Sequence, residues 1–486
     1  MKHPGVLIAA TKSGSGKTTI TCALLQALKQ RDIRTRAFKC GPDYIDPMFH
    51  KQIIGVPSRN LDTFFSGPEQ IRELYQMNSK GTDDKTEISV IEGVMGLYDG
   101  LGGIREEGSA YHLAEVLDIP IVLVLDAHGM GRSMIPLLAG FLQYDKSHLI
   151  RGVILNRTTP MFLQTIAPLI EKELKLPVLG CFPKTQKLVL PGRHLGLVMP
   201  GEIDDIRRQL HKAAVQLEKT VDIDRILAIA NEAGNIDDFS RKTADGDALQ
   251  TSERTADGQE KKNGIEPEND GKSCANLRLA VAQDEAFCFY YEDNLRLLRE
   301  KGVTIVWFSP IHDEALPQNI DGILLGGGYP ELHAGELEAN EKMRKAIRDS
   351  ITAGMPSVAE CGGFMYLHDT LVDKTGAAFH MAGVLPAECK DTGKLVRFGY
   401  VEIEEKEADW LPAGTKIRGH EFHYYDSSDN GMDCIAQKPV TGRNWPCIHS
   451  TSDHWWGYPH LYYPSNPEFV YHFVAQMRKW KQETTK

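Results

Sequence analysis

Paired cysteines and an excess of basic charge are both missing from this sequence, and each absence removes a class of function. The nine cysteines are scattered and include no CxxC pair, so neither a zinc site nor a disulfide framework is indicated, and unpaired thiols suit a reducing cytoplasm. The 55 basic residues are outnumbered by 66 acidic ones, giving a formal net charge of −11. No overall positive field therefore attracts nucleic acid or an anionic membrane.

Long hydrophobic segments are missing as well. The run Ile119–Leu125 is too short to span a bilayer. The N-terminus has only a short apolar run before polar residues and glycines, which predicts a buried strand instead of a signal peptide. We therefore expect a soluble, cytoplasmic protein without a nucleic-acid or membrane partner, whose 486 residues allow two or three domains.

The apolar runs that are present predict an α/β domain over residues 1–232. Short apolar runs alternate there with helix-like stretches such as Thr18–Arg31 and Met161–Leu174. Continuous apolar runs are typical of strands covered on both faces, so we predict a doubly wound, mostly parallel sheet. The predicted strands are Val6–Ala10, Thr35–Lys39, Ile88–Ile91, Ile119–Asp126, Gly152–Asn156 and Val178–Gly180.

A change of composition separates this domain from a second one. Residues 233–276 contain almost no large apolar side chains, so we predict a flexible linker that cannot bury enough surface to order itself. A second α/β pattern occupies residues 277–486, with strand-like runs LRLAVAQ, VTIVWFS, GILLGGG and PSVAE. The sequence thus predicts two α/β domains joined by a tether.

A phosphate-binding loop lies in ATKSGSGKTT, between the first predicted strand and the first predicted helix. Backbone amides in such a turn cradle phosphates at the positive end of the helix dipole. Lys17 is expected to reach the terminal phosphates and Thr18 to bind Mg²⁺. Thr11 replaces the usual glycine, and Lys12 stands where a dimerising subset of P-loop proteins carries a second lysine, which permits a homodimer. The predicted nucleotide-binding residues of this loop are Thr11, Lys12, Gly14, Ser15, Gly16, Lys17 and Thr18.

Acidic residues follow the next two predicted strands of the first domain, in FKCGPDYIDPMFH and IEGVMGLYDG. Ligands of doubly wound sheets bind at the carboxyl ends of the strands, so these acids and the phosphate loop are expected to form one metal–phosphate site. The predicted metal ligands are Thr18, Asp43 and Glu92. The predicted substrate-contacting residues are Lys39, which offsets phosphoryl charge, and Asp43, Tyr44, Asp46 and Asp99.

The second domain carries a candidate nucleophile, Cys361, in AECGGFMYL. A cysteine on a sharp strand-to-helix turn is exposed to substrate, and neighbouring glycines leave backbone amides free for an oxyanion. We predict oxyanion contacts from Gly362 and, in the upstream loop LLGGGYPE, from Gly327 and Gly328. The candidate bases are His420, His423 and His460, and the chemistry of the residues alone does not choose among them.

The segments FKCGPDYIDP and EGVMGLYDG, together with the phosphate loop, resemble the cobyrinic acid a,c-diamide synthase family. GVILNR, RHLGL, DEAFCFYYEDNL, GGGYPE and RGHEFH extend the similarity over nearly the whole chain apart from the predicted linker. The resemblance implies a class-I glutamine amidotransferase fold for the second domain, ATP and Mg²⁺ as cofactors, and Asn156 as an adenine contact. It also selects His460 as the base for Cys361. Tyr462 stands where other class-I amidotransferases often carry glutamate, which leaves the third member of the triad open.

The resemblance implies an enzyme that uses ATP and glutamine to amidate the a and c carboxylates of cobyrinate or hydrogenobyrinate through an acyl phosphate. Because no corrin-specific motif is visible, a related tetrapyrrole such as nickel-sirohydrochlorin stays an alternative substrate. An alternative from another class is a partitioning-type ATPase switch, which shares the Lys12-type loop but needs no glutamine.

Overall fold

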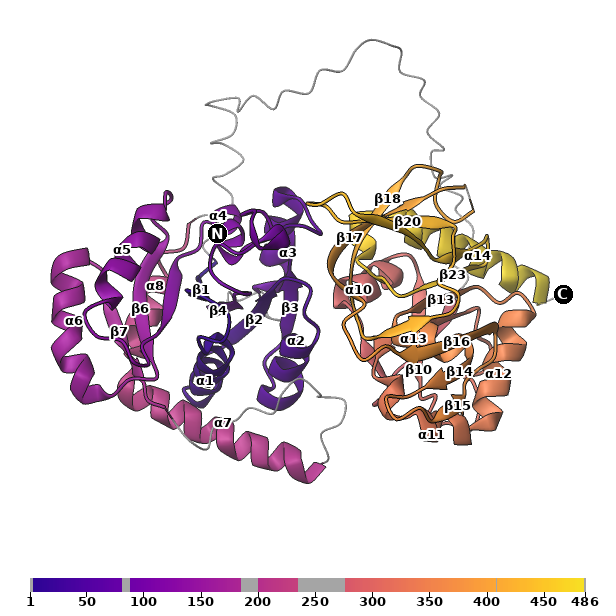
Figure 1. The fold of residues 1–486 in the computed structure, drawn as a ribbon, viewed down its shortest axis with the longest axis horizontal. Coiled ribbons are helices and arrows are strands. Elements are labelled where there is room, and N and C mark those ends of the chain that lie inside the picture. Colours follow the sequence, from indigo (N-terminus) through magenta and orange to yellow (C-terminus); the bar gives the residue numbers. More distant parts are fainter. Residues whose placement is uncertain (1–2, 81–87, 185–199, 235–275, 408, 485–486) are drawn as a thin grey trace, which may run out of the picture.

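The first domain is built on seven strands that are all parallel, in the order β3-β2-β4-β1-β5-β6-β7 (Figure 1). The computed structural model describes residues 3–80, 88–184, 200–234, 276–407 and 409–484. The chain turns back between β1 and β4, and the crevice at such a reversal is where doubly wound sheets bind ligands. The strands are β1 Gly5–Ala10, β2 Thr35–Cys40, β3 Ser58–Leu61, β4 Ile88–Glu92, β5 Ile121–Asp126, β6 Ile150–Asn156 and β7 Val178–Phe182.

Helices cover both faces of this sheet because successive side chains of each buried strand point to opposite sides. Leu7 and Ala9 of β1 join the core beneath one set of helices, whereas Val6, Ile8 and Ala10 join the core beneath the other. The first set is α3 Pro68–Asn78, α4 Ala110–Leu117, α5 Met134–Tyr144 and α6 Pro160–Leu174. The second set is α1 Lys17–Gln30, α7 Pro200–Thr220 and α8 Ile223–Ala230, with α2 Ile45–Phe49 and the π-helix His50–Ile54 beside them.

The doubly wound parallel sheet predicted from the sequence is confirmed, and all six predicted strands occur with small shifts at their ends. The short edge strand β3 was missed because its sequence, SRNL, has no apolar run and is mostly half-exposed. The predicted linker begins inside the packed domain, since Ala233 is buried and the Gly234 amide donates to the Asp118 carbonyl at 2.9 Å. The remainder of the predicted linker, 235–275, and the RHLGL segment lie outside the described residues.

The second domain has a six-stranded central sheet, ordered β10-β8-β11-β13-β23-β22, in which only β22 is antiparallel. Its strands are β8 Leu277–Ala282, β10 Val303–Phe308, β11 Gly322–Leu325, β13 Ser357–Glu360, β22 His449–Ser450 and β23 His454–Gly457. The helices are α10 Glu292–Glu300, α11 Ala334–Ala339, α12 Glu341–Thr352, α13 Gly362–Leu367 and α14 Glu468–Thr484. The predicted α/β organisation of this domain is therefore confirmed.

Further strands pack around this sheet and carry residues of the later site. A five-stranded antiparallel sheet has the order β21-β20-β17-β18-β24, and a four-stranded sheet has the order β15-β14-β16-β19. The short strand β9 (Phe287–Phe289) pairs with β12 (Gly327–Gly328). The other strands are β14 His368–Val372, β15 Ala378–His380, β16 Leu385–Asp391, β17 Arg397–Glu405, β18 Lys416–His423, β19 Tyr425–Ser427, β20 Cys434–Gln437, β21 Asn444–Cys447 and β24 His460–Leu461.

The two domains meet through an aromatic cluster and hydrogen bonds. In Figure 1 the edge of the first domain that carries β3 and α2 faces β17 of the second. The interdomain cluster consists of Tyr44, Phe64, Phe65, Leu101, Tyr291 and Tyr462. Around it, the Tyr400 hydroxyl donates to Asp62 Oδ2, and the Arg418 guanidinium donates to the Phe64 carbonyl, each at 2.7 Å. Among the described residues, no helix is long and apolar enough to cross a membrane.

Candidate active sites

The phosphate loop connects β1 to α1 at the carboxyl edge of the first sheet. Gly14 and Gly16 have φ angles of 74° and 93°, left-handed values that a glycine adopts without strain. A side chain at Gly16 would also collide with Asn156, whose amide nitrogen would lie 2.1 Å from the added Cβ. Asn156 Nδ2 instead donates to the Ser15 carbonyl at 2.7 Å, which ties the end of β6 to the loop. The loop is therefore held in shape by its glycines and by Asn156.

Glu92 is the centre of a charged network at the end of β4. The carboxylate is fully buried, and its Oε1 accepts from the Thr18 hydroxyl at 2.6 Å and from Lys39 Nζ at 3.0 Å. His50 Nε2 lies 3.3 Å from the other oxygen, Oε2. Lys39 also pairs with Asp46. The structure thus brings together Thr18, Lys39, Asp46 and Glu92, as the sequence predicted, and adds His50.

The pKa values of this network follow from burial and from the neighbouring charges. Burial alone would raise the pKa of Glu92, but Lys39, His50 and the Thr18 hydroxyl outweigh it and hold the pKa well below its usual range. Burial and the charge of Glu92 raise the pKa of Asp46 to about 7. Burial, followed by repulsion from Lys39, lowers the pKa of Lys17. The site therefore keeps Glu92 as its fixed anion, whereas Asp46 titrates near neutral pH.

The other predicted residues of the first site are not part of the hydrogen-bonded network around Glu92. Asp43 Oδ1 accepts from the Ile45 amide at 2.8 Å, and Asp99 Oδ2 accepts from the Gly96 amide at 2.9 Å, so each carboxylate also shapes its own loop. Thr11 is half-buried and Lys12 is exposed. Mg²⁺ favours one or two carboxylates together with phosphate oxygens and water, and the adjoining Thr18 hydroxyl and Glu92 carboxylate fit that pattern.

Cys361 stands on a sharp turn between β13 and α13. Its φ and ψ angles of 48° and −104° are unusual for a residue with a side chain, and such strain occurs at functional turns. The Cys361 amide donates to the Gly457 carbonyl at 2.8 Å, which anchors the turn to β23. Burial and the charge of Glu331 raise the pKa of the thiol, and the Gly362 amide opposes this more weakly. The nucleophile therefore needs a base to remove its proton.

The glycines predicted to bind the oxyanion surround Cys361. A Cβ added to Gly362 would lie 3.1 Å from the Gly328 amide nitrogen, so these two backbone segments touch. A Cβ added to Gly327 would lie 2.2 Å from His460 Cε1. Gly327 is thus required for the histidine ring to approach, which is a packing role in addition to the predicted oxyanion role.

His460, on β24, is fixed by rings on several sides. It stacks on His420 with centroids 4.9 Å apart and an interplanar angle of 17°, and Tyr44 packs on it at 5.3 Å. Burial, together with the charge of His423, lowers the pKa of His460 to about 3, so the imidazole is neutral in the resting site. The Tyr291 hydroxyl and His420 Nδ1 are hydrogen-bonded at 3.1 Å, and Tyr44 of the first domain packs on the His420 ring at 5.6 Å, so the RGHEFH segment borders the domain interface.

Comparison with known proteins shows what this pair of sites is similar to. Residues 6–198 match the family described as the CobQ/CobB/MinD/ParA nucleotide binding domain, and residues 278–454 match the CobB/CobQ-like glutamine amidotransferase domain. The cobyrinate a,c-diamide synthase of Salmonella typhimurium is 39% identical over 98% of this chain and 99% of its own. Those of Caldanaerobacter subterraneus and Picrophilus torridus are each 36% identical, over 91% and 98% of this chain and 91% and 99% of their own lengths.

The chain belongs to the cobyrinate a,c-diamide synthase family. The resemblance predicted from the sequence is confirmed, and so is the prediction of a glutamine-dependent ligase with a nucleotide-binding half and an amidotransferase half. The sequence did not indicate His50, which lies beside Glu92 in the first site. His50 ends the motif FKCGPDYIDPMFH and begins a π-helix, an element often found at functional positions.

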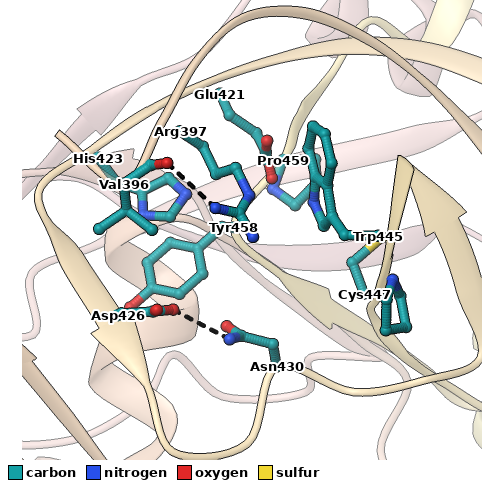
Figure 2. Close-up of a pocket in the computed structure, with 11 residues that line it drawn as sticks. Val396, Arg397, Glu421, His423, Asp426, Asn430, Trp445, Cys447, Tyr458 and Pro459 are labelled. Atoms are coloured by element: carbon teal, nitrogen blue, oxygen red, sulfur yellow. Dashed lines mark hydrogen bonds between the residues drawn. The ribbon is translucent and has the colours of Figure 1, made fainter. Parts of the chain in front are cut away.

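A polar pocket is lined by residues of the second domain that include Tyr458 (Figure 2), which follows the Gly457 carbonyl that anchors the Cys361 turn. Among the described side chains, buried atoms of Arg397, Glu421, His423 and Asn430 line it without a hydrogen-bond partner. The charge of Glu421 raises the pKa of Cys361, and His423 lowers that of His460, so the pocket lies within electrostatic reach of both groups. Burial raises the pKa of Glu421 to about 7. Buried polar atoms without partners indicate a place for a polar ligand.

Tyr44 connects the two sites of the protein. It precedes α2 in the first domain, yet its ring is buried in the second, stacked on Phe289 at 5.0 Å and packed on His460. Asp46, two residues later, contacts Lys39 in the phosphate site. A short segment of chain therefore contacts the charged network of one site and the histidine of the other. The predicted contact of Tyr44 with substrate stays a prediction.

Proposed function

We propose that this protein uses ATP and glutamine to amidate the a and c carboxylates of cobyrinate in cobalamin biosynthesis, through an acyl phosphate. The observation that carries the proposal is that two candidate active sites, one in each domain, are in direct contact. One is the phosphate loop with its Thr18–Glu92–Lys39 network, and the other is the Cys361 turn, whose preceding residue Glu360 lies 4.0 Å from His460. Tyr44 of the first domain packs directly on His460 of the second. The names of the relatives supply the identity of the substrate.

The first site activates the substrate carboxylate. A carboxylate resists ammonia because its leaving group would be oxide, and phosphorylation replaces oxide by phosphate. A carboxylate oxygen of the substrate attacks the γ-phosphorus of ATP, and the bond to ADP breaks. Lys17 and Lys39 offset the charge of the transferring group, and Asn156 contacts the adenine. Mg²⁺, held by Thr18 and Glu92 with Asp43, would neutralise phosphate charge.

The second site releases ammonia from glutamine. His460 Nε2 takes the thiol proton while Cys361 Sγ bonds to the side-chain amide carbon, and the Gly328 and Gly362 amides with Gly327 bind the oxyanion. The histidine returns the proton to the leaving nitrogen, the carbon–nitrogen bond breaks, and a thioester stays on Cys361. Water, deprotonated by His460, then releases glutamate and restores the thiol.

The pocket of Figure 2 suits the amino-acid end of glutamine. Glutamine carries an α-carboxylate and an α-ammonium, and a site that binds it should present one cation and one anion. Arg397 and Glu421 supply these charges, and buried atoms of both lack partners among the described residues. We assign Arg397 to the carboxylate and Glu421 to the ammonium.

The ammonia attacks the acyl phosphate carbon in the first domain, phosphate leaves, and an amide results. Asp46 and Asp99 position the substrate near the phosphate loop, and the titration of Asp46 near neutral pH suits it to take a proton from the attacking nitrogen. The homodimer that Lys12 permits stays a prediction, supported by the exposure of that lysine on the loop.

Mass spectrometry of the product tests the substrate and the reaction together. Incubation of the protein with cobyrinate, Mg-ATP and glutamine should add two amide groups, and omission of ATP or glutamine should prevent this. Nickel-sirohydrochlorin is the parallel substrate. Amidation of it, but not of cobyrinate, would keep the mechanism and overturn the named substrate. Glutaminase activity without amidation of either compound would overturn both named substrates, and absence of both activities would overturn the whole assignment.

Cys361→Ala tests the division of labour between the domains. The variant should lose amidation with glutamine by at least about 10³-fold and keep amidation with ammonium salts within about twofold, because the nucleophile acts only on glutamine. Cys389→Ala, another buried thiol, is the matched control. Loss of both activities in Cys361→Ala with intact folding would contradict the assignment.

A further inference from the structure

The position that often holds the third triad member in class-I amidotransferases is occupied here by a residue that faces elsewhere. Tyr462, two residues after His460, is buried and stacks on Phe65 of the first domain at 5.1 Å with an interplanar angle of 8°. Its hydroxyl donates to Asp293 Oδ2 at 3.3 Å. Tyr462 therefore belongs to the interdomain cluster and supplies no carboxylate to the histidine.

A buried carboxylate reaches the histidine from another element. Glu360 is the last residue of β13, immediately before Cys361, and is 5% exposed. Its Oε2 lies 4.0 Å from His460 Nδ1. Nδ1 is buried and has no hydrogen-bond partner among the described residues. A buried ring nitrogen without a partner is costly, so its orientation toward a carboxylate calls for an explanation.

The side chain of Glu360 is held by the Tyr463 hydroxyl and by a backbone hydrogen bond from Leu461. The Tyr463 hydroxyl donates to Oε1 at 2.9 Å, which leaves Oε2 toward the imidazole. The imidazole itself is fixed by the stack on His420 and by the close approach of Gly327. With Nδ1 toward Glu360, the nitrogen left for the thiol proton is Nε2.

We propose that Glu360 is the positioning carboxylate of the glutaminase site, accepting Nδ1–H of His460 and thereby holding Nε2 unprotonated toward Cys361. The proposal rests on the Cys361–His460 pair assigned above. The 4.0 Å separation exceeds a hydrogen bond, and catalytic hydrogen bonds are often long until substrate binds. The carboxylate also offsets the positive charge that the ring acquires when it takes the thiol proton.

The surroundings of Glu360 favour this role at alkaline pH, where its carboxylate is ionised. Burial raises its pKa to about 8, opposed more weakly by the Tyr463 hydroxyl. The other titratable groups near it are His460, Tyr44, Tyr290 and Tyr463. Because the carboxylate must be ionised to accept Nδ1–H, glutaminase activity should be lost as the pH falls through about 8.

Glu360→Gln separates this role from a merely structural one. The amide keeps the shape and an oxygen for the Tyr463 hydroxyl, but it presents N–H groups to Nδ1. The ring must then carry its proton on Nε2, where it cannot accept the thiol proton. We expect kcat for glutamine hydrolysis to fall at least about 100-fold, with KM little changed. Amidation with ammonium salts should stay within about twofold.

Three companion variants make the result decisive. Glu360→Asp should recover part of the lost kcat because it keeps the charge, and Tyr463→Phe, which removes only the Oε1 contact, should be far less impaired than Glu360→Gln. The glutaminase rate of wild type should fall as the pH drops below about 8, and the rate of Glu360→Gln should show no such fall. Cys361→Ala is measured alongside. If Cys361→Ala is inactive on glutamine but Glu360→Gln hydrolyses it within about twofold of wild type, the proposal for Glu360 is wrong. If Cys361→Ala is itself active, the underlying pair is wrong.

Discussion

Glu92 accepts hydrogen bonds from both Thr18 and Lys39, so its charge organises the phosphate site. Glu92→Gln keeps the shape but removes the anion that holds Lys39 and would face Mg²⁺. We expect amidation to fall at least about 100-fold with glutamine or ammonia, because both need the acyl phosphate. Basal hydrolysis of glutamine should persist, and steady-state assays with each nitrogen source would show the difference.

The matched control for this variant is Glu69→Gln, an exposed glutamate on α3. It should leave all three rates near wild type. A Glu92→Gln protein that still amidates with ammonia at the wild-type rate would show that Glu92 has no part in activation.

Glu360 is expected to trade stability for activity. Burial raises its folded pKa to about 8, above the ordinary value of 4.5 that applies in the unfolded chain. The folded wild type therefore retains a proton that the unfolded chain releases, and wild type loses stability as the pH rises from about 4.5 to about 8. Glu360→Gln has no such ionisation, so its advantage in Tm should grow over that range.

Thermal unfolding at several pH values measures the difference in Tm between Glu360→Gln and wild type. Glu314→Gln, an exposed glutamate, is the control and should follow wild type. A Tm difference between Glu360→Gln and wild type that does not change with pH would contradict the raised pKa.

Local motifs made some site residues predictable and left others hidden. Lys17, Thr18 and Cys361 lie in short patterns whose chemistry follows from neighbouring glycines in the sequence. His50 and Glu360 carry no such pattern, because their roles depend on atoms far away in the chain, Glu92 and His460. A histidine or glutamate that acts through a distant partner looks like any other until the fold brings the partner near.

At the scale of elements, α2 and the residue before it join the two sites. Tyr44→Ala removes the ring that packs on His460 and should loosen the histidine without touching the phosphate loop. We expect more glutamine to be hydrolysed per amide formed, because ammonia release is no longer tied to the first site. Tyr44→Phe keeps the ring and should behave like wild type. Glutamate and product measured in the same reaction give the ratio, and an unchanged ratio in Tyr44→Ala would contradict this role.

Buried elements of the fold were predictable and exposed or short ones were not. The continuous apolar runs of β1 and β5 reveal strands covered on both faces, and their positions were predicted to within two residues. The edge strand β3 and the two-residue strands β12 and β24 lack any such run. These strands form because they pair with strands distant in sequence, and the pattern of apolar residues along the chain does not reveal such pairing.

At the scale of the whole molecule, a few polar contacts fasten the domains around the interdomain cluster. Tyr400→Phe with Arg418→Ala removes the hydrogen bonds to Asp62 and to the Phe64 carbonyl, each worth about 1 kcal/mol. We expect glutamine-dependent amidation to fall about tenfold or more, while amidation with ammonia stays within about twofold. Kinetics with the two nitrogen sources measure this, and equal loss of both would mean that the contacts support the first domain alone.

Cys361 lies buried beneath its turn, only 7% exposed, and its raised pKa keeps it a thiol. A soluble alkylating reagent attacks thiolates, so it can modify Cys361 only during the moments when the site is open and the proton is gone. The rate of alkylation therefore measures how often the Cys361 site opens. Faster alkylation in the presence of ATP and tetrapyrrole would show that ligand binding in the first domain increases opening of the Cys361 site in the second.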